Sequence, residues 1–168
     1  MKLPLQGPEL LTEVHDVLRF DCGNEALNRF LHRYALQNQR NQSARTYVAL
    51  RGETHVIGYY SLAAASAEYE TVPARIAKGL AQHPIPLTLL ARLAVDQTEQ
   101  GAGIGAGLLK DALKRFLQAQ SIIAARALVV HAKDDQAVEF YRHFGFVPSP
   151  LDRYHLYLMT KDVQECLA

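Results

Sequence analysis

The sequence lacks the features of a membrane-spanning or disulfide-bonded protein. No apolar run is long enough to cross a bilayer, because charged residues or prolines interrupt each one. The N-terminal stretch lacks the long apolar core of a signal peptide. The two cysteines, Cys22 and Cys166, lie far apart with no metal-ligand spacing around them. We therefore expect two reduced thiols, no bound metal and a cytoplasmic location.

Acidic residues are absent from two long stretches. Neither 26–52 nor 71–95 contains Asp or Glu. The basic residues in these stretches are Arg29, Arg33, Arg40, Arg45, Arg51, Arg75, Lys78 and Arg92. The net charge is only +1, but this distribution lets a nearly neutral chain carry a positive face.

The chain has enough apolar residues to form a core. Its 168 residues are 49% hydrophobic and 21% charged, which predicts a single domain over residues 1–168. Hydrophobic periodicity predicts helices over 24–39, 73–80, 103–119 and 135–144. It predicts strands over 45–51, 55–66, 86–96, 125–132 and 154–160. The expected fold class is α/β, with a mixed sheet flanked by helices.

A glycine-rich turn joins a predicted strand to the strongest predicted helix. It contains Gly101, Gly103, Gly105 and Gly107. The unpaired N–H groups and the dipole of a helix N-terminus favour an anion, and glycine lets a phosphate approach the backbone. A P-loop would require a Gly-Lys-Ser/Thr ending, which is absent. A dinucleotide-binding loop would follow the first strand, with an acid about 20 residues on. A glycine turn with no ligand remains the alternative.

Two spaced motifs resemble the GNAT N-acetyltransferase superfamily. The first is Gln100-x-x-Gly103-x-Gly105, and the second is Ala137-x-x-Phe140-Tyr141-x-x-x-Gly145-Phe146. The resemblance implies a mostly antiparallel (α+β) sheet with a bulged, splayed central strand, and acetyl-CoA as cofactor. The cofactor-binding residues that it implies are Leu93, Ala94, Val95, Gln100, Gly101, Ala102, Gly103, Ile104, Gly105, Ala106 and Asp134. Asp134 stands where the superfamily usually has Asn, and unlike the Asn amide its carboxylate can only accept hydrogen bonds.

Tyr141 is the candidate general acid. A phenol with a pKa of ~10 can protonate a departing thiolate whose thiol has a pKa of ~8.5. A backbone N–H of 93–95 can donate a hydrogen bond to the oxyanion of the tetrahedral intermediate. The alternative for Tyr141 is a core aromatic. No carboxylate stands out as a base, because Asp96 follows the strand and Glu99 precedes the glycine loop, and both are interpreted as turn residues. An α-amine, with a pKa near ~8, needs less help from a base than lysine at ~10.4, so the missing base favours an α-amine acceptor.

The arginines suggest a polyanionic acceptor. At 100° per residue, Arg29, Arg33 and Arg40 fall within an arc of about 40° on the predicted helix. Arginine clusters suit phosphates, and a large polyanionic substrate such as tRNA is the simplest reason to have them. The residues expected to bind tRNA are Arg29, Arg33, Arg40, Arg75, Lys78 and Arg92.

Three further stretches resemble the GNAT toxins of bacterial type II toxin–antitoxin systems. They are "FDCGNEALNRFLHRYALQNQRNQSARTYVAL" (20–50), "LARLAVD" (90–96) and "FYRHFGFVPSP" (140–150). The resemblance implies acetylation of the α-amino group of aminoacyl-tRNA, which blocks translation. It places the catalytic tyrosine at Tyr141. It also implies a homodimer and a ribbon-helix-helix antitoxin partner.

Two other functions remain open at this point. One is an acetyltransferase for a small-molecule amine or a protein N-terminus. The other is a module that binds acyl-CoA without catalysis and tolerates loss of Tyr141. The choice of aminoacyl-tRNA would depend on a pocket, for which the 30s and 147–154 are candidates. The histidines His131, His143 and His155 are interpreted as ordinary structural residues.

Overall fold

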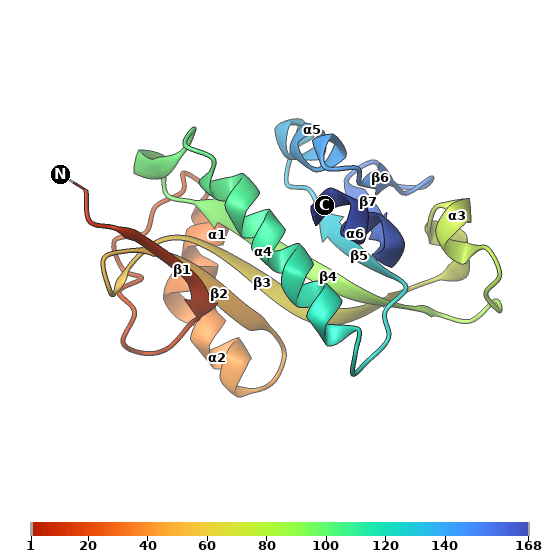
Figure 1. Cartoon of the computed structure of the whole chain (residues 1–168), viewed down its shortest axis with the longest axis horizontal. Coiled ribbons are helices and arrows are strands. Elements are labelled where there is room, and N and C mark those ends of the chain that lie inside the picture. The colour runs from red at the N-terminus through yellow and green to blue at the C-terminus, as the bar shows by residue number, and fades with distance from the viewer. Residues whose placement is uncertain (1, 168) are drawn as a thin grey trace. The chain divides into compact units, whose positions relative to one another are not determined.

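A computed structural model of the chain describes residues 2–167 (Figure 1). The strands are β1 (Leu5–Leu10), β2 (Arg45–Arg51), β3 (His55–Ala67), β4 (Ile85–Val95), β5 (Ala127–His131), β6 (Val147–Pro148) and β7 (His155–Met159). Their order in the sheet is β1-β2-β3-β4-β5-β7-β6. The pairing of β4 with β5 is parallel, whereas β1–β2, β2–β3, β5–β7 and β6–β7 are antiparallel.

The helices alternate with these strands. They are α1 (Glu25–Arg29), α2 (Ala35–Arg40), α3 (Ala74–Ala77), α4 (Ile104–Ala119), α5 (Asp135–His143) and α6 (Thr160–Leu167). A π-helical turn, η1 (Phe30–Tyr34), joins α1 to α2, and short 3₁₀ turns occupy η2 (Tyr69–Thr71) and η3 (Gln97–Glu99). None of the helices in 2–167 is long and apolar enough to span a bilayer.

The chain divides into two compact units. Unit 1 contains residues up to Ala63 together with Ala91–Ala112, and unit 2 contains Ala64–Leu90 together with residues from Leu113 on. The single domain expected from the length stays a prediction.

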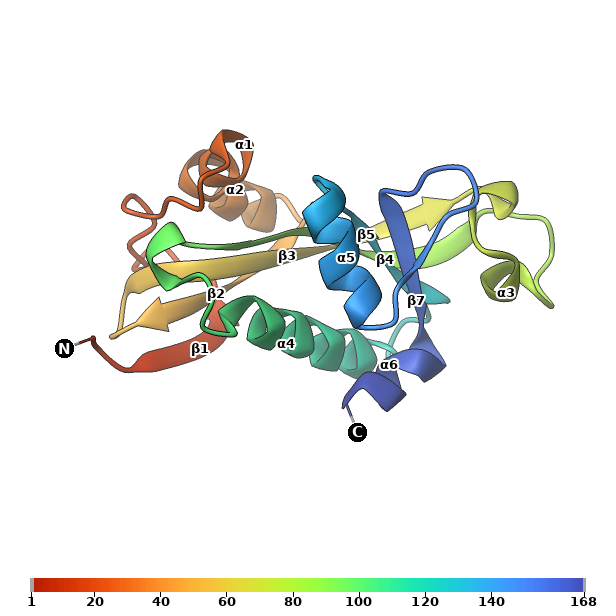
Figure 2. The same ribbon diagram turned by 90° about the horizontal axis from the view of Figure 1, so that it is seen from above.

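Unit 1 is built on the antiparallel strands β1, β2 and β3. The helical segment 25–40 packs on one face, where Phe30 stacks on Tyr59 of β3 with ring centroids 6.1 Å apart. Gly58, the next residue on β3, faces α4. A Cβ at Gly58 would lie 3.0 Å from Leu108 of α4, so glycine permits this close packing. Figure 2 shows α1 and α2 on one side of β2 and β3, and α4 on the other.

Unit 2 contains the parallel pair of the sheet. β4 pairs with β5 from Leu87↔Ala127 to Leu90↔Val130, and β5 then pairs with β7. Apolar side chains of α3, β4, β5 and β7 form its core, including Ile76, Leu87, Val129 and Tyr157. Asp134 caps α5 by accepting a hydrogen bond from the Ala137 N–H at 2.8 Å.

The predicted elements are largely confirmed. All five predicted strands and all four predicted helices are present, with ends that differ by up to three residues. The sequence analysis did not predict β1, β6 or α6, and the predicted helix 24–39 is interrupted by η1. The α/β class with a mixed, mostly antiparallel sheet is confirmed, while the bulge and splay of the central strand stay predictions.

Candidate functional site

The glycine loop lies between the end of β4 and the start of α4, as the sequence predicts. Gly101 and Gly103 adopt φ values of 82° and 83°, which L side chains rarely adopt. A Cβ built on either residue would meet nothing within 4 Å. The loop backbone is therefore open on the side that a side chain would cover, and a phosphate could approach it there.

The first turn of α4 presents donors at the same place. Gly107 donates its N–H to the Gly103 carbonyl at 3.0 Å. The N–H groups of Ile104, Gly105 and Ala106 therefore precede the hydrogen-bond ladder of the helix. Together with the helix dipole, these donors suit the pyrophosphate of coenzyme A.

Strand β4 ends with Leu93, Ala94 and Val95, three of the residues that the family resemblance assigns to the cofactor. Ala94 is buried in the core of unit 1, whereas Leu93 and Val95 are half-buried. β5 ends at His131, one residue beyond Val130, the partner of Leu90. Residues 92–95 therefore continue past the end of that parallel ladder, where backbone groups of the strand can serve a ligand.

Polar side chains hold the segment just before the glycine loop. Gln100 donates from Nε2 to the Val95 carbonyl at 2.9 Å and to the Cys22 carbonyl at 3.3 Å. Asp96 accepts from the Thr98 N–H at 2.9 Å and caps η3. Gln100 thus has a structural role in shaping the loop, whatever it contributes to the cofactor.

Glu99 anchors the same segment to β2 and the N-terminal strand region. Its carboxylate is buried and accepts from Arg51 Nη2 at 3.0 Å, and from Lys2 Nζ at 3.0 Å. The hydrogen bond from Arg51 is the main cause that lowers the pKa of Glu99, and Lys2 adds to it. Glu99 is thus ionised and paired, so it is not a free base.

The sequence analysis missed a second contributor to this region, the turn at Asp21–Gly23. The backbone of Asp21 and Cys22 bonds to Asp96, Gln97 and Gln100, as detailed below. The available signal was Gly23 with Asp21 two residues before it and Asn24 directly after it, residue types that favour a tight turn.

Tyr141 lies on α5 of unit 2, among aromatic rings. Its centroid is 5.2 Å from that of Phe140 and 5.4 Å from that of Phe146. Burial raises the pKa of Tyr141 above its ordinary value. Among residues 2–167, no hydrogen bond engages the Tyr141 hydroxyl and no buried side-chain oxygen lacks a partner, so this hydroxyl is the accessible tip of a buried ring.

Asp134 has a clear structural role. Its Oδ1 is the cap acceptor of α5, and Asn or Asp fills such a position equally well. The Asp found where the superfamily usually has Asn therefore preserves the start of the helix that carries Tyr141. Its contact with coenzyme A stays a prediction.

The predicted arginine cluster differs from the sequence picture in two ways. Because η1 inserts one residue into the helical segment, Arg40 is rotated by about 100° from its place on an uninterrupted helix. The acid-free stretch also has acidic neighbours in space: Arg29 lies 3.8 Å from Glu25, and Arg40 lies 3.5 Å from Glu13. The expectation of a common arc without acids is therefore wrong for this helix.

The other three basic residues differ in their surroundings. Arg75 of unit 2 is paired with both carboxylate oxygens of Asp162. Arg92 of unit 1 stacks its guanidinium 3.8 Å above the Phe30 ring centroid. Within residues 2–167, Arg33, Lys78 and Arg92 form no ion pair, so these three cations are available to phosphates. Binding of tRNA by the six predicted residues stays a prediction.

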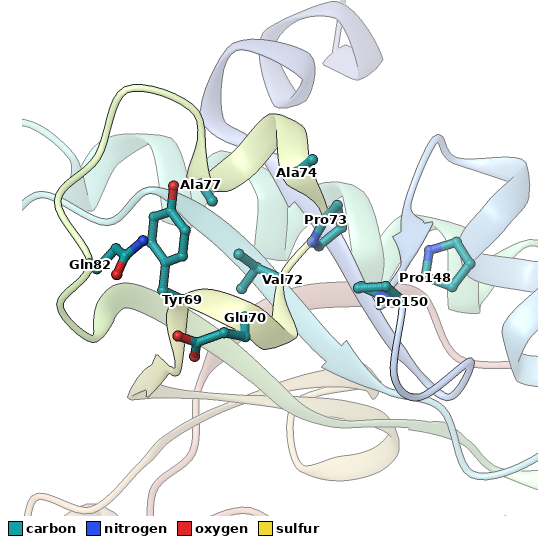
Figure 3. A pocket seen from close by; sticks show the side chains of 9 residues that line it. All are labelled: Tyr69, Glu70, Val72, Pro73, Ala74, Ala77, Gln82, Pro148 and Pro150. Carbon is teal, nitrogen blue, oxygen red and sulfur yellow. The ribbon is translucent and has the colours of Figure 1, made fainter.

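A pocket lies in each unit near a segment expected to select the aminoacyl-tRNA, the 30s in unit 1 and 147–154 in unit 2. In unit 1 a cavity of about 160 Å³ is lined by Leu11, Thr12, Glu13, His15, Val17, Leu31, His32, Arg33 and Leu36. In unit 2 an open pocket of about 600 Å³ is lined by Tyr69, Glu70, Val72, Pro73, Ala74, Ala77, Gln82, Pro148 and Pro150. Figure 3 labels the lining residues of this pocket, with Tyr69 and Gln82 on the left of the view and Pro148 and Pro150 on the right. Arg33 is the one predicted site residue among these lining residues.

The sequence matches known acetyltransferases over most of its length. The profile of the acetyltransferase (GNAT) domain matches residues 42–148. The chain is 40% identical over 158 residues to a tRNA-acetylating toxin of Mycobacterium tuberculosis (strain ATCC 25618 / H37Rv), covering 94% of each chain.

Solved structures agree with the sequence match. AtaT complexed with acetyl-methionyl-tRNAfMet has a TM-score of 0.89 at 32% identity, with 98% of this chain and 100% of that chain covered. A tyrosine-to-phenylalanine mutant of KacT has a TM-score of 0.87 at 28% identity, with 98% and 99% covered. AtaTR bound with AcCoA has a TM-score of 0.81 at 31% identity, with 99% of each chain covered. The predicted resemblance to GNAT toxins and the predicted acetyltransferase class are confirmed.

Proposed function

Because this chain belongs to the GNAT acetyltransferase family, we propose that it transfers the acetyl group of acetyl-CoA to the α-amino group of aminoacyl-tRNA. The observation that carries this proposal is the 40% identity to a tRNA-acetylating toxin over 94% of both chains. A structure of AtaT with acetyl-methionyl-tRNAfMet covers almost the whole of this chain and adds support. Acetylation of the α-amine would block translation.

The residues at the start of α4 fit coenzyme A. The open backbone at Gly101 and Gly103 and the donors of 104–106 would receive the pyrophosphate. Leu93, Ala94 and Val95, at the end of β4, would bind the arm that carries the acetyl thioester. Acetyl-CoA supplies the activated acetyl group, and a backbone N–H of 93–95 would stabilise the oxyanion that develops on it.

Tyr141 would act as the general acid. A phenol with an ordinary pKa of ~10 is protonated at neutral pH and can donate its proton to the departing thiolate. Burial raises the pKa of Tyr141 further, which makes it a weaker acid. Its hydroxyl has no competing hydrogen bond among residues 2–167. The carboxylates near the loop, Asp96 and Glu99, are engaged in a cap and an ion pair. An acceptor that needs little help from a base, such as an α-amine, agrees with this arrangement.

The acceptor would be held through its phosphates. Arg33, Lys78 and Arg92 are the best candidates of the six, because they have no ion pair in residues 2–167. Arg29, Arg40 and Arg75 would have to exchange a carboxylate for a phosphate. Each phosphate contact that is removed should lower the salt dependence of tRNA binding by about one unit of slope.

The proposed partners are a second copy of this chain and an antitoxin of the ribbon-helix-helix type. AtaT has been solved with the C-terminus of the antitoxin AtaR, which is the support for an antitoxin partner here. A substrate found in the cytoplasm would place the reaction there. Size-exclusion chromatography with light scattering tests the dimer, and co-expression with the neighbouring gene product tests the antitoxin.

Mass spectrometry of aminoacyl-tRNA tests the activity. After incubation with acetyl-CoA and nuclease digestion, N-acetyl-aminoacyl-adenosine should appear. Tyr141→Phe should lower kcat by about 10²- to 10⁴-fold without loss of folding. Acetylation of small amines but not of aminoacyl-tRNA would favour the small-amine enzyme. Coenzyme A binding without any transfer would favour the non-catalytic module.

A further inference from the structure

Residues 96–100, which lead into the glycine loop, form hydrogen bonds with a turn some 75 residues earlier in the chain. The Asp21 N–H donates to Oδ2 of Asp96 at 3.0 Å, and the Gln97 N–H donates back to the Asp21 carbonyl at 2.8 Å. Gln100 donates to the Cys22 carbonyl at 3.3 Å. Three bonds thus join the turn to the residues immediately before Gly101.

The turn is held in shape by the Asp21 side chain. Oδ1 of Asp21 accepts from the Gly23 N–H at 2.9 Å and from Nδ2 of Asn28 at 2.9 Å. Asn28 is buried on α1, and its Oδ1 accepts from the Cys22 N–H at 2.9 Å. These bonds hold the pKa of the Asp21 carboxyl below its ordinary value, with Gly23 as the main cause.

The turn and the loop segment are also in close contact. Gly23 has a φ of 89°, and a Cβ at this position would lie 2.5 Å from Nε2 of Gln97. The positive φ therefore favours glycine, whereas the close contact falls on the flexible end of the exposed Gln97 side chain, which can move. Backbone groups of the turn bond to 96–100, while the Asp21 carboxylate bonds to Gly23 and Asn28.

We propose that Asp21 is a positioning residue for the coenzyme A loop. Its carboxylate does not contact the loop residues 101–106. It shapes the turn, the turn fixes 96–100, and these residues set the direction in which the N–H groups of 101–106 point. Misdirected donors weaken an anion site without removing it. This inference rests on the proposed acetyl-CoA site.

Direct coenzyme A binding and steady-state kinetics test the inference together. Isothermal titration calorimetry with coenzyme A needs no acceptor, so it separates this inference from the choice of tRNA. Asp21→Ala should raise the Kd for coenzyme A by about tenfold. The KM for acetyl-CoA should rise in parallel, while kcat at saturating acetyl-CoA stays within about twofold of the parent.

Two further variants make the result specific. Asp21→Asn keeps an acceptor for Gly23 and Asn28, so its Kd should stay within about twofold of the parent. Asp16→Ala is the matched control, because the Asp16 carboxylate also accepts from a nearby N–H and from a side chain, those of Leu18 and Arg19, and both lie within its own turn. Its Kd should equal that of the parent. Thermal unfolding monitors folding, and Asp21→Ser replaces Asp21→Ala should that variant not fold.

The outcomes separate the hypotheses. A parent protein that does not bind coenzyme A would overturn the proposed function itself. A parent that binds, with Asp21→Ala and Asp21→Ser binding equally well, would overturn the positioning role. An equal loss in Asp16→Ala, or a fall in kcat with unchanged KM, would also contradict it.

Discussion

The two units hold their candidate functional groups in opposite ways. In unit 1 the candidate site consists of backbone N–H groups of the glycine loop. The residues just before this loop are held by hydrogen bonds of Gln100 and Asp96 and by the ion pair of Glu99. Unit 2 carries a side-chain site, Tyr141, and aromatic rings surround it. A site made of N–H groups requires a defined chain path, whereas a single hydroxyl is positioned by the packing of the ring that carries it.

The largest expected effect lies in the aromatic surroundings of Tyr141. Phe146→Ala removes a buried ring that packs on Tyr141 and should lower the free energy of unfolding by about 3–5 kcal/mol. Phe144→Ala is the control, since Phe144 is only half-buried and should cost less. Chemical denaturation measures both. An equal loss of unfolding free energy in the two variants would contradict the larger role assigned to the buried Phe146 ring.

The open glycine loop should respond next. Gly103→Ala forces a Cβ into a backbone with φ of 83° and should cost about 1–2 kcal/mol of stability. The new Cβ also projects into the space meant for the pyrophosphate, so the Kd for coenzyme A should rise at least about tenfold. Gly107→Ala, inside α4 and without a positive φ, should be neutral or stabilising by up to about 1 kcal/mol. A larger rise in the Kd for coenzyme A in Gly107→Ala than in Gly103→Ala would contradict pyrophosphate binding at this loop.

Acid should weaken the polar anchoring of unit 1 through Glu99. The folded-state pKa of Glu99 lies below its unfolded value of ~4.3, so its stabilisation is complete above that pH and is lost as the pH falls through the folded pKa. The stability difference between the parent and Glu99→Gln should therefore be largest near neutrality and shrink below about pH 4. Urea unfolding at several pH values measures it. A constant difference would exclude a role for the Glu99 charge.

The smallest effect is expected at the exposed arginine pairs. Arg40→Gln breaks an ion pair with Glu13 in which both side chains are more than half exposed. The free energy of unfolding should change by less than about 0.5 kcal/mol. Any effect of this variant should appear instead as weaker tRNA binding at low salt. A large loss of stability would show that the pair is structural.

Sequence reasoning succeeded where an element depends on neighbours in the chain. The strand, the glycine loop and α4 are continuous over 85–119, so periodicity and glycine placement predicted this strand–loop–helix unit, and the anion site within it stays a prediction. It failed at the arginines for two physical reasons. A π-turn changes the helical phase and leaves little signal in the hydrophobic pattern, and the carboxylates of Glu13 and Asp162 come from distant segments.

The sequence by itself determined the fold class, the GNAT family, the open glycine loop and Tyr141 on its helix, because each depends on local spacing. Only the tertiary structure decided what holds these groups. The bonds of Asp21 and Cys22 to 96–100 and the pairing of Glu99 with Arg51 join residues at least 48 positions apart. Such contacts form when the chain folds, so hydrophobic periodicity contains no record of them.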